Sequence, residues 1–214
     1  MNPISPELPR GMSLASRSYN ASGAATTMAQ QSHSITADEL WCMRDDEYHR
    51  YELDRGRLLT MTPSGFLHGA ITARLGAVLS NYVDASKTGV VVAGEPGFKL
   101  ESDPDTVRAP DVAFISRDRI PPDGLTSRFW DGAPDLAIEV FSPGDRQAEV
   151  DRKIEQYLQS GVKQVWLVEP TLRRVTIRIA DRRTLVLNDA DVLDGGDLLP
   201  GFRYPLSRLF DFDL

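Results

Sequence analysis

The sequence predicts a mixed β-sheet with helices on its flanks, which is an α/β (α+β) fold. Two kinds of apolar periodicity indicate this class. Side chains alternate between two faces along Leu136 to Phe141, as they do in a strand, and apolar residues recur at helical spacing along Leu67 to Val83 and along Val150 to Leu158. The predicted order is a helix, a hairpin, a helix, strands, a helix and further strands, which is typical of a sheet packed between helices.

Length and composition indicate one folded domain preceded by a tail. The chain has 214 residues, of which 41% are hydrophobic, and this suits a single compact domain. Residues 1–34 are rich in Ser, Ala, Gly and Pro and lack apolar periodicity. They are therefore predicted to be a disordered N-terminal extension, and the folded domain is predicted to span residues 35–214.

Targeting signals and cysteine content indicate the compartment. The N-terminus lacks the apolar core of a secretory signal, and no apolar run approaches the roughly 20 residues that a transmembrane helix needs. The single cysteine, Cys42, excludes an internal disulfide and a cysteine zinc site. We therefore expect a cytoplasmic protein with no membrane partner.

The net charge of −7 weighs against a protein that coats nucleic acid, because binding to phosphates relies on clustered Lys and Arg. It is compatible with a nuclease, since site carboxylates add negative charge that a bound metal would offset. The arginines are bunched along the chain, as at Arg146 and Arg152. Some local basic surface is therefore expected, although a solvated face explains most of these arginines.

The N-terminal half of the domain is predicted to begin with two helices and a hairpin. A capping-box spacing predicts a short helix over Ala37–Met43. An Asp-Arg-Gly turn within Tyr48–Met61 predicts a β-hairpin, and apolar spacing predicts a long helix over Leu67–Val83 that Gly89 closes. Strands are then expected at Val90–Ala93, at Phe98–Leu100 paired with it across a Gly94–Gly97 turn, and after Asp111, beyond a loop at 103–105.

The C-terminal half follows a long connection over Ile120–Pro134. After the strand Leu136–Phe141, Asp145 is predicted to be the N-cap of a helix that Gly161 ends. The apolar stripe of this helix comprises Val150, Ile154, Tyr157 and Leu158. The remaining predicted elements are a strand at Gln164–Val168, a hairpin of Arg174–Ile179 and Thr184–Leu187, and a helical turn at Leu206–Phe210.

Two carboxylates and a lysine in this framework are candidates for chemistry. Glu139 lies in the middle of an apolar strand, where an ionised carboxylate is costly unless a cation or a donor meets it. Lys153 lies beside the apolar stripe of the next helix, so its ammonium could reach back over the strand end. Asp111 precedes another apolar strand. Together they are consistent with a site of divalent-metal hydrolysis.

Each of these residues also has a purely structural explanation. Asp111 follows a proline and could serve as a turn residue at the start of its strand. Glu139 could form an ion pair with an arginine, and Lys153 could pair with Glu149 at i,i+4 on a solvated helix face. Taken one at a time, these structural explanations stay open.

The sequence from about residue 35 to 210 resembles the Uma-two (Uma2) family, which is described as restriction endonucleases and looks like a branch of the PD-(D/E)XK nuclease superfamily. The motifs that carry the resemblance occur in the family's order. They are Tyr51-Glu52-Leu53 with Gly56, His68-Gly69, Arg108-x-Pro110-Asp111-Val112, Pro134 to Arg146, Glu149-x-x-x-Lys153-x-x-x-Tyr157-x-x-x-Gly161, and Leu199 to Phe202.

The resemblance implies a restriction-endonuclease-like mixed sheet flanked by helices, with an N-terminal β-hairpin. It implies that Asp111 and Glu139 hold Mg²⁺ or Mn²⁺, with the backbone carbonyl of Val140 as a further ligand. The superfamily lysine normally stands two residues after the Glu, where this chain has Phe141. The family pattern places it on the following helix, at Lys153.

Two further family positions have more than one possible role. Glu52 could complete a second metal position, hold Lys153 as an ion-pair partner, or pair with an arginine across the sheet. His68 could contact phosphate, relay a proton near neutral pH, or cap its helix.

The resemblance therefore implies a metal-dependent endonuclease that hydrolyses DNA, with Lys153 orienting water or stabilising transition-state charge. By analogy with restriction enzymes that cut both strands, a homodimer is expected. Two alternatives stay open. One is a nuclease-fold binding or assembly module with weak or no catalysis, and the other is a hydrolase of RNA or of another phosphoester.

Overall fold

The computed structural model of the protein describes residues 34–43 and 50–212. The predicted N-terminal extension therefore lies outside the described residues, except for Ser34, and so do the first two residues of the predicted hairpin. Among the described residues, no helix is long and apolar enough to cross a membrane. Cys42 is exposed and forms no disulfide.

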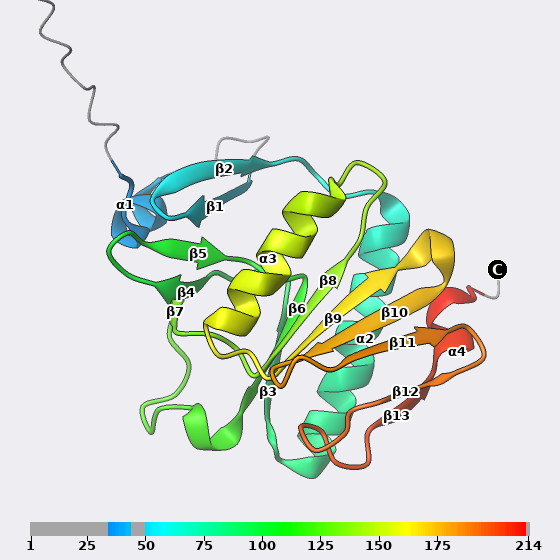
Figure 1. The fold of residues 1–214 in the computed structure, drawn as a ribbon. Helices are drawn as coiled ribbons and strands as arrows, with labels where there is room; N and C mark the ends of the chain where they lie inside the picture. The colour runs from blue at the N-terminus through cyan, green and yellow to red at the C-terminus, as the bar shows by residue number, and fades with distance from the viewer. Residues whose placement is uncertain (1–33, 44–49, 213–214) are drawn as a thin grey trace, which may run out of the picture. The chain divides into compact units, whose positions relative to one another are not determined.

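The centre of the folded unit is a six-stranded mixed sheet (Figure 1). Strands β8 and β9 run parallel, and all other neighbours in this sheet are antiparallel. The strand order is β11 (Thr184–Asn188), β10 (Arg174–Ile179), β9 (Gln164–Glu169), β8 (Leu136–Val140), β6 (Val112–Ser116) and β3 (Gly89–Ala93). This arrangement confirms the predicted mixed sheet.

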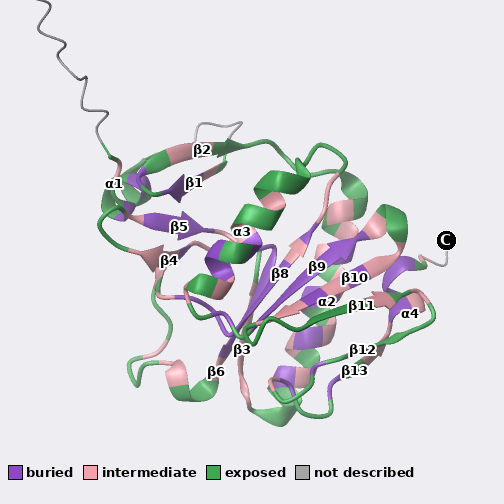
Figure 2. Cartoon of the chain, in the orientation of Figure 1, coloured by how far each residue is buried: buried purple, intermediate pink, exposed green. Residues whose placement is uncertain are grey.

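Helices cover both faces of this sheet, as Figure 1 shows. The long helix α2 (Phe66–Ser86) packs Ile71, Leu75 and Leu79 onto one face, which also receives alternate residues of β8 such as Ile138. The opposite face is covered by α3 (Gln147–Gln159), whose Ile154 and Tyr157 pack against Ala137 and Val165. Because β8 and β9 are covered on both faces, they are almost entirely buried (Figure 2).

A second sheet of five strands carries the predicted N-terminal hairpin. Its strand order is β2 (Arg57–Met61), β1 (Arg50–Asp54), β5 (Thr106–Arg108), β4 (Phe98–Glu101) and β7 (Trp130–Asp131). Helix α1 (Ala37–Cys42) packs against it through Ala37 and Leu40, which join Leu53 and Val107 in a small core. The predicted capping box is present, since the Thr36 side chain accepts the N–H of Glu39.

The C-terminal segment completes the core beside α2. A two-stranded sheet pairs β12 (Val192–Asp194) with β13 (Arg203–Pro205), and α4 (Leu206–Phe210) follows. Leu206 and Leu209 are buried in the same core as α2. Short 3-10 helices occur at Arg117–Arg119 and Pro170–Leu172.

The predicted pairing of Val90–Ala93 with Phe98–Leu100 is wrong. Strand β3 pairs with β6, whereas β4 pairs with β5 and β7 in the other sheet. Between β3 and β4, Gly94 and Glu95 both have positive φ angles, of 91° and 61°. These consecutive left-handed residues redirect the chain from one sheet to the other instead of closing a hairpin.

Two predicted helix boundaries are also wrong. Helix α2 ends at Ser86, with Lys87 in the left-handed conformation, and Gly89 begins β3 instead. A Cβ at Gly89 would lie 2.1 Å from the Ile115 carbonyl oxygen, so close strand packing explains this glycine. Arg146, not Asp145, is the N-cap of α3.

Asp145 has a different local role from the one predicted. Its carboxylate accepts the N–H of Ser142 at 2.7 Å, which closes the Ser-Pro-Gly-Asp turn before the helix. The side chain is therefore committed to the turn rather than to the first N–H groups of α3.

Candidate functional site

A pocket of about 690 Å³ lies where the two sheets, α2 and α3 meet. The hairpin, the start of α2, the ends of β6 and β8, and one face of α3 contribute to its walls. All of the site residues predicted from the sequence line this pocket. They are Glu52, His68, Asp111, Glu139, Val140 and Lys153.

Strand pairing brings Asp111 and Glu139 together. Val112 of β6 pairs with Ile138 of antiparallel β8, so Asp111 and Glu139 occupy the next opposed positions. The Val140 N–H donates to Asp111 Oδ2 at 2.7 Å, and the same oxygen lies 3.1 Å from His68 Nε2. The Asp111 carboxylate is thus fixed from β8 and from the first turn of α2.

Lys153 reaches back from α3 over the end of β8. Its Nζ lies 2.9 Å from Glu139 Oε1, 3.0 Å from Glu139 Oε2 and 2.9 Å from Glu52 Oε1, and it donates to the Ala109 carbonyl at 3.2 Å. Only 13% of the Lys153 side chain is exposed. These contacts replace the Glu149 pairing that the helical spacing allowed.

The oxygens of Glu52 are already engaged by the protein. Glu52 Oε2 accepts from Arg108 Nη1 at 2.8 Å, and Oε1 accepts the Ala109 N–H at 2.9 Å besides contacting Lys153. Burial alone would raise the pKa of Glu52, but the charges of Lys153 and Arg108 lower it below its usual value. Glu52 is therefore an ionised partner of Lys153.

Glu139 has the opposite electrostatic balance. Burial raises its pKa to about 7, and the negative charges of Asp111 and Glu52 add to this rise, although Lys153 opposes it. Burial alone would lower the pKa of Lys153, but Glu139 and Glu52 raise it, so the ammonium stays charged. Two carboxylates, those of Glu139 and Glu52, thus contact one ammonium, and Asp111 lines the same pocket.

The pKa of His68 depends on nearby carboxylates, chiefly that of Asp111. Burial lowers the pKa of its imidazole, but the hydrogen bond and the charge of Asp111 outweigh this effect and raise it. Its Nδ1 is buried and has no hydrogen-bond partner among the described residues. The histidine therefore contacts the site through Nε2, on Asp111.

Sequence reasoning missed three residues that hold this arrangement. The Tyr157 hydroxyl donates to Glu139 Oε1 at 2.8 Å. Arg108 donates through Nε and Nη2 to Gln156 Oε1, and Gln156 Nε2 donates to Asp54 Oδ1 at 2.7 Å. These contacts connect α3 to the five-stranded sheet through groups buried from solvent.

The sequence held a signal for these residues. Lys153, Gln156 and Tyr157 are spaced i, i+3 and i+4 and therefore share one helix face. Tyr157 belongs to the predicted apolar stripe and to the family motif on this helix, and a buried phenol needs a hydrogen-bond partner. Arg108, two residues before Pro110, likewise needs acceptors when it is buried on a strand.

The donor set at the pocket fits a small, oxygen-preferring cation. Among the described residues, no group of three or more His, Cys, Asp or Glu side chains is placed to hold a metal ion. Asp111 and Glu139 nevertheless offer two carboxylates at opposed strand positions. Mg²⁺ is commonly held by one or two carboxylates and keeps several waters, so the two carboxylates suffice for it.

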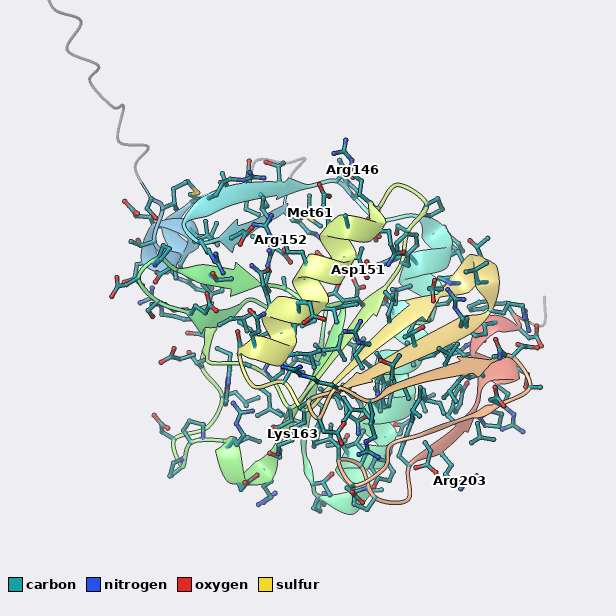
Figure 3. All side chains as sticks on the ribbon, in the orientation of Figure 1. Met61, Arg146, Asp151, Arg152, Lys163 and Arg203 are labelled. Carbon is teal, nitrogen blue, oxygen red and sulfur yellow. The ribbon has the colours of Figure 1, made fainter. Side chains whose placement is uncertain are left out.

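Exposed arginines lie near the mouth of the pocket. Figure 3 labels Arg146, which is the N-cap of α3, Arg152 within α3, and Met61 at the end of β2. The Arg146 and Arg152 side chains are 82% and 59% exposed, and Arg152 also pairs with Asp54. Arg50, which lines the pocket, pairs with Glu95. Arg146 is also within ion-pair distance of a carboxylate, at 3.9 Å from Glu149, so each of these three arginines has an acidic partner.

Comparison with known proteins bears on both the family and the fold. The model of the Uma2 family, described as "Putative restriction endonuclease", matches residues 37–207. The fold is similar to the crystal structure of a putative nuclease belonging to DUF820 from Anabaena variabilis ATCC 29413, with a TM-score of 0.72 and 23% sequence identity. The similarity covers 82% of this chain and 97% of that chain. No curated protein matches the sequence.

Proposed function

The chain belongs to the Uma2 family of putative restriction endonucleases, and we propose that it is a metal-dependent endonuclease that hydrolyses phosphodiester bonds in DNA. One observation carries this proposal: Asp111 and Glu139 line the same pocket, with the Lys153 ammonium on Glu139. Carboxylates beside a lysine in an open pocket suit cleavage of a negatively charged phosphodiester.

We assign the cation to Asp111 and Glu139, with the Val140 carbonyl as a further ligand. When bound, Mg²⁺ or Mn²⁺ would supply Lewis-acid polarisation of the phosphate and of the attacking water. Glu52 is held by Arg108, the Ala109 N–H and Lys153, so we assign it to orienting Lys153 rather than to the cation.

Lys153 is proposed to act on the water or on the phosphate. Its ammonium would orient the attacking water or stabilise the negative charge that develops on the phosphate in the transition state. Glu52 would keep Lys153 extended toward the pocket, and His68 would orient Asp111 through its Nε2 contact. The raised pKa of His68 also suits a proton relay near neutral pH.

DNA is the proposed substrate, and a homodimer is the proposed assembly. Arg146 is exposed beside the pocket and would contact backbone phosphates, which needs no sequence-specific reading. Two copies related by a two-fold axis could each cleave one strand of a duplex.

Cleavage assays with metal and with chelator test the activity. Supercoiled plasmid, single-stranded DNA and RNA would each be incubated with the purified protein and Mg²⁺ or Mn²⁺, or with EDTA. We expect metal-dependent cleavage of DNA that Glu139→Ala lowers by about 100-fold or more, because it removes a carboxylate from the site. The matched control is Glu155→Ala, which removes a half-exposed glutamate from the solvent face of α3.

The outcomes separate the alternatives. Equal cleavage by the Glu139→Ala variant would contradict the assigned site. Cleavage of RNA alone would show that RNA, and not DNA, is the substrate. Cleavage by neither protein on any substrate would contradict the endonuclease proposal.

A nuclease-fold binding or assembly module is the second candidate. Both Glu139 oxygens contact Lys153, and Oε1 also accepts the Tyr157 hydroxyl. A site closed in this way by its own cation favours weak or absent catalysis. Binding of DNA without cleavage, retained in the Glu139→Ala variant, would support this candidate.

A further inference from the structure

Strand β11 forms an open edge of the six-stranded sheet. Among the described residues it has a hydrogen-bonded neighbour, β10, on one side only. Edge strands present unpaired N–H and C=O groups, and natural proteins usually protect them with charged residues, proline or a covering segment. The middle of β11 carries no charged residue and no proline, since its sequence is Thr-Leu-Val-Leu-Asn.

The apolar residues Leu185 and Val186 are exposed on opposite faces of this edge strand. Figure 2 shows β11 exposed along most of its length, in contrast to the buried β8 and β9. Leu185 is 48% exposed and Val186 is 52% exposed, and successive strand residues point to opposite faces. Leu187 is partly buried against the main core, on the same face as Leu185.

The other edge of the sheet differs. Strand β3 is half-buried along most of its length, and its Val91 packs against the core that α2 covers. It also lies beside the connection from Gly94 to the second sheet. Edge pairing is therefore more accessible at β11 than at β3.

The sequence of β11 is complementary to itself in the antiparallel direction. In a register centred on Val186, Val186 meets Val186 of the second copy, Leu185 meets Leu187, and Thr184 meets Asn188. Directly opposed apolar residues stabilise antiparallel pairs. In this register the numbers of two opposed residues always differ by an even number. The N–H and C=O groups that point outward from β11 in one copy therefore lie opposite the outward-pointing groups of the second copy.

Charge complementarity extends this register by one residue at each end. Arg183 precedes the strand and Asp189 follows it, and they are opposed in the same two-fold register. Within the chain, Arg183 pairs with Asp181 and Asp189 pairs with Arg173. These pairs are largely or partly exposed and therefore weak enough to rearrange at an interface.

We propose that β11 is a homodimer interface, at which two copies pair antiparallel about a two-fold axis through Val186. The two six-stranded sheets then form one continuous sheet of twelve strands. The contact is isologous, because the same strand of each copy is buried against itself. It places no residue in the partner's pocket, since β9 and β10 separate β11 from β8.

The mass of the full-length protein in solution tests this interface. Light scattering after size exclusion should give a dimer that dissociates on dilution. Val186→Lys places two ammonium groups face to face at the axis, and it should raise the dimer dissociation constant by 100-fold or more. Leu125→Lys is the matched control, because Leu125 is 59% exposed in the connection before β7 and should leave the dimer unchanged.

Cysteine cross-linking tests the register itself. In a Cys42→Ser background, Val186→Cys should form an intermolecular disulfide under mild oxidation, because directly opposed residues on paired strands are close enough to bridge. Leu125→Cys in the same background should stay monomeric on non-reducing gels. Circular dichroism would verify that each variant is folded.

A protein that is monomeric at all accessible concentrations would overturn the proposal. So would a dimer that Val186→Lys leaves intact, or one that Val186→Cys fails to cross-link. None of these readouts depends on nuclease activity, so a failed interface and a failed catalytic site are distinguishable.

Discussion

Asp135 directly precedes β8 and Glu139 lies near the end of that strand. Their surroundings nevertheless shift their carboxyl pKa values in opposite directions. Glu139 is buried with two further carboxylates near it, and its pKa rises to about 7. Burial would also raise the pKa of Asp135, but hydrogen bonds from Lys163 and Ser116 and the charge of Arg119 lower it. One end of β8 is therefore built for stability, and the other holds unbalanced charge of the kind found at functional sites.

Asp135 provides a test of this contrast through pH. Because its pKa is lower in the folded state, its stabilising effect is present above the unfolded value near 3.8 and is lost as the pH falls through the folded value. We expect Asp135→Asn to lower the free energy of unfolding by about 2 kcal/mol at pH 7, and by less at pH 3. Urea unfolding at both pH values measures this difference.

The control for this test is Asp84→Asn, which changes an exposed residue of α2. It should alter stability little at either pH. An equal loss of stability for Asp135→Asn at pH 7 and pH 3 would contradict the electrostatic explanation and indicate a packing effect.

The prediction of individual residues from the sequence worked best where burial and charge conflict. Glu139 stood out because an apolar strand cannot hold an ionised carboxylate alone, and the structure brings Lys153 to it. Gln156 shows no such conflict, because a glutamine on a helix is ordinarily exposed, and its place on the same helix face as Lys153 and Tyr157 is the one signal in the sequence. Its buried contacts with Arg108 and Asp54 depend on a second sheet whose position the sequence does not reveal.

At the scale of elements, α3 is the part that assembles the site. Its one face presents Lys153, Gln156 and Tyr157 to acidic and basic groups of both sheets. Gln156 accepts from Arg108 with one end of its amide and donates to Asp54 with the other. The orientation of this amide therefore links the helix position to the hairpin that carries Glu52.

We expect Gln156→Glu to disturb this link with almost no change in shape. The variant replaces the donor opposite Asp54 with an oxygen, which removes a hydrogen bond and opposes two carboxylates, at a cost of about 2 kcal/mol. The helix should shift, and Lys153 should become more accessible. Peptide-resolved labelling of the four lysines with an amine reagent measures this effect.

In the native protein Lys153 should react most slowly of the four lysines, and Gln156→Glu should speed its labelling several-fold. Lys163, with a 59% exposed side chain at the other end of α3 (Figure 3), serves as an internal reference. Gln159→Glu changes an exposed glutamine of the same helix and should have no effect. Unchanged labelling of Lys153 would contradict the proposed link, and so would an equal rise at all four lysines.

Long elements with a regular apolar pattern were predictable from the sequence, and short elements were not. The helices α2 and α3 and the strands β8 and β9 each show a clear apolar pattern. Strands β5 and β7 comprise three and two residues, which is too short for any period to appear. The predicted N-cap of α3, Asp145, is one residue too early. An aspartate suits both an N-cap and the turn that Asp145 closes, and the sequence does not distinguish the two roles.

At the scale of the whole molecule, the site requires both sheets and both long helices. Glu52 comes from the hairpin, Asp111 and Glu139 from the central sheet, His68 from α2 and Lys153 from α3. The sequence predicted the sheet class, but it did not reveal that the chain crosses to a second sheet after β3. Strand pairing depends on contacts far apart in the chain, and a short turn such as Gly94–Gly97 does not specify it.

The most direct test of the central claim is a crystal structure of the protein soaked in Mn²⁺, with anomalous data collected near the manganese edge. We predict one strong anomalous peak between the Asp111 and Glu139 carboxylates, and its loss in a Glu139→Ala crystal. A peak elsewhere, or none between these two residues at saturating Mn²⁺, would contradict the proposal that they form a metal site.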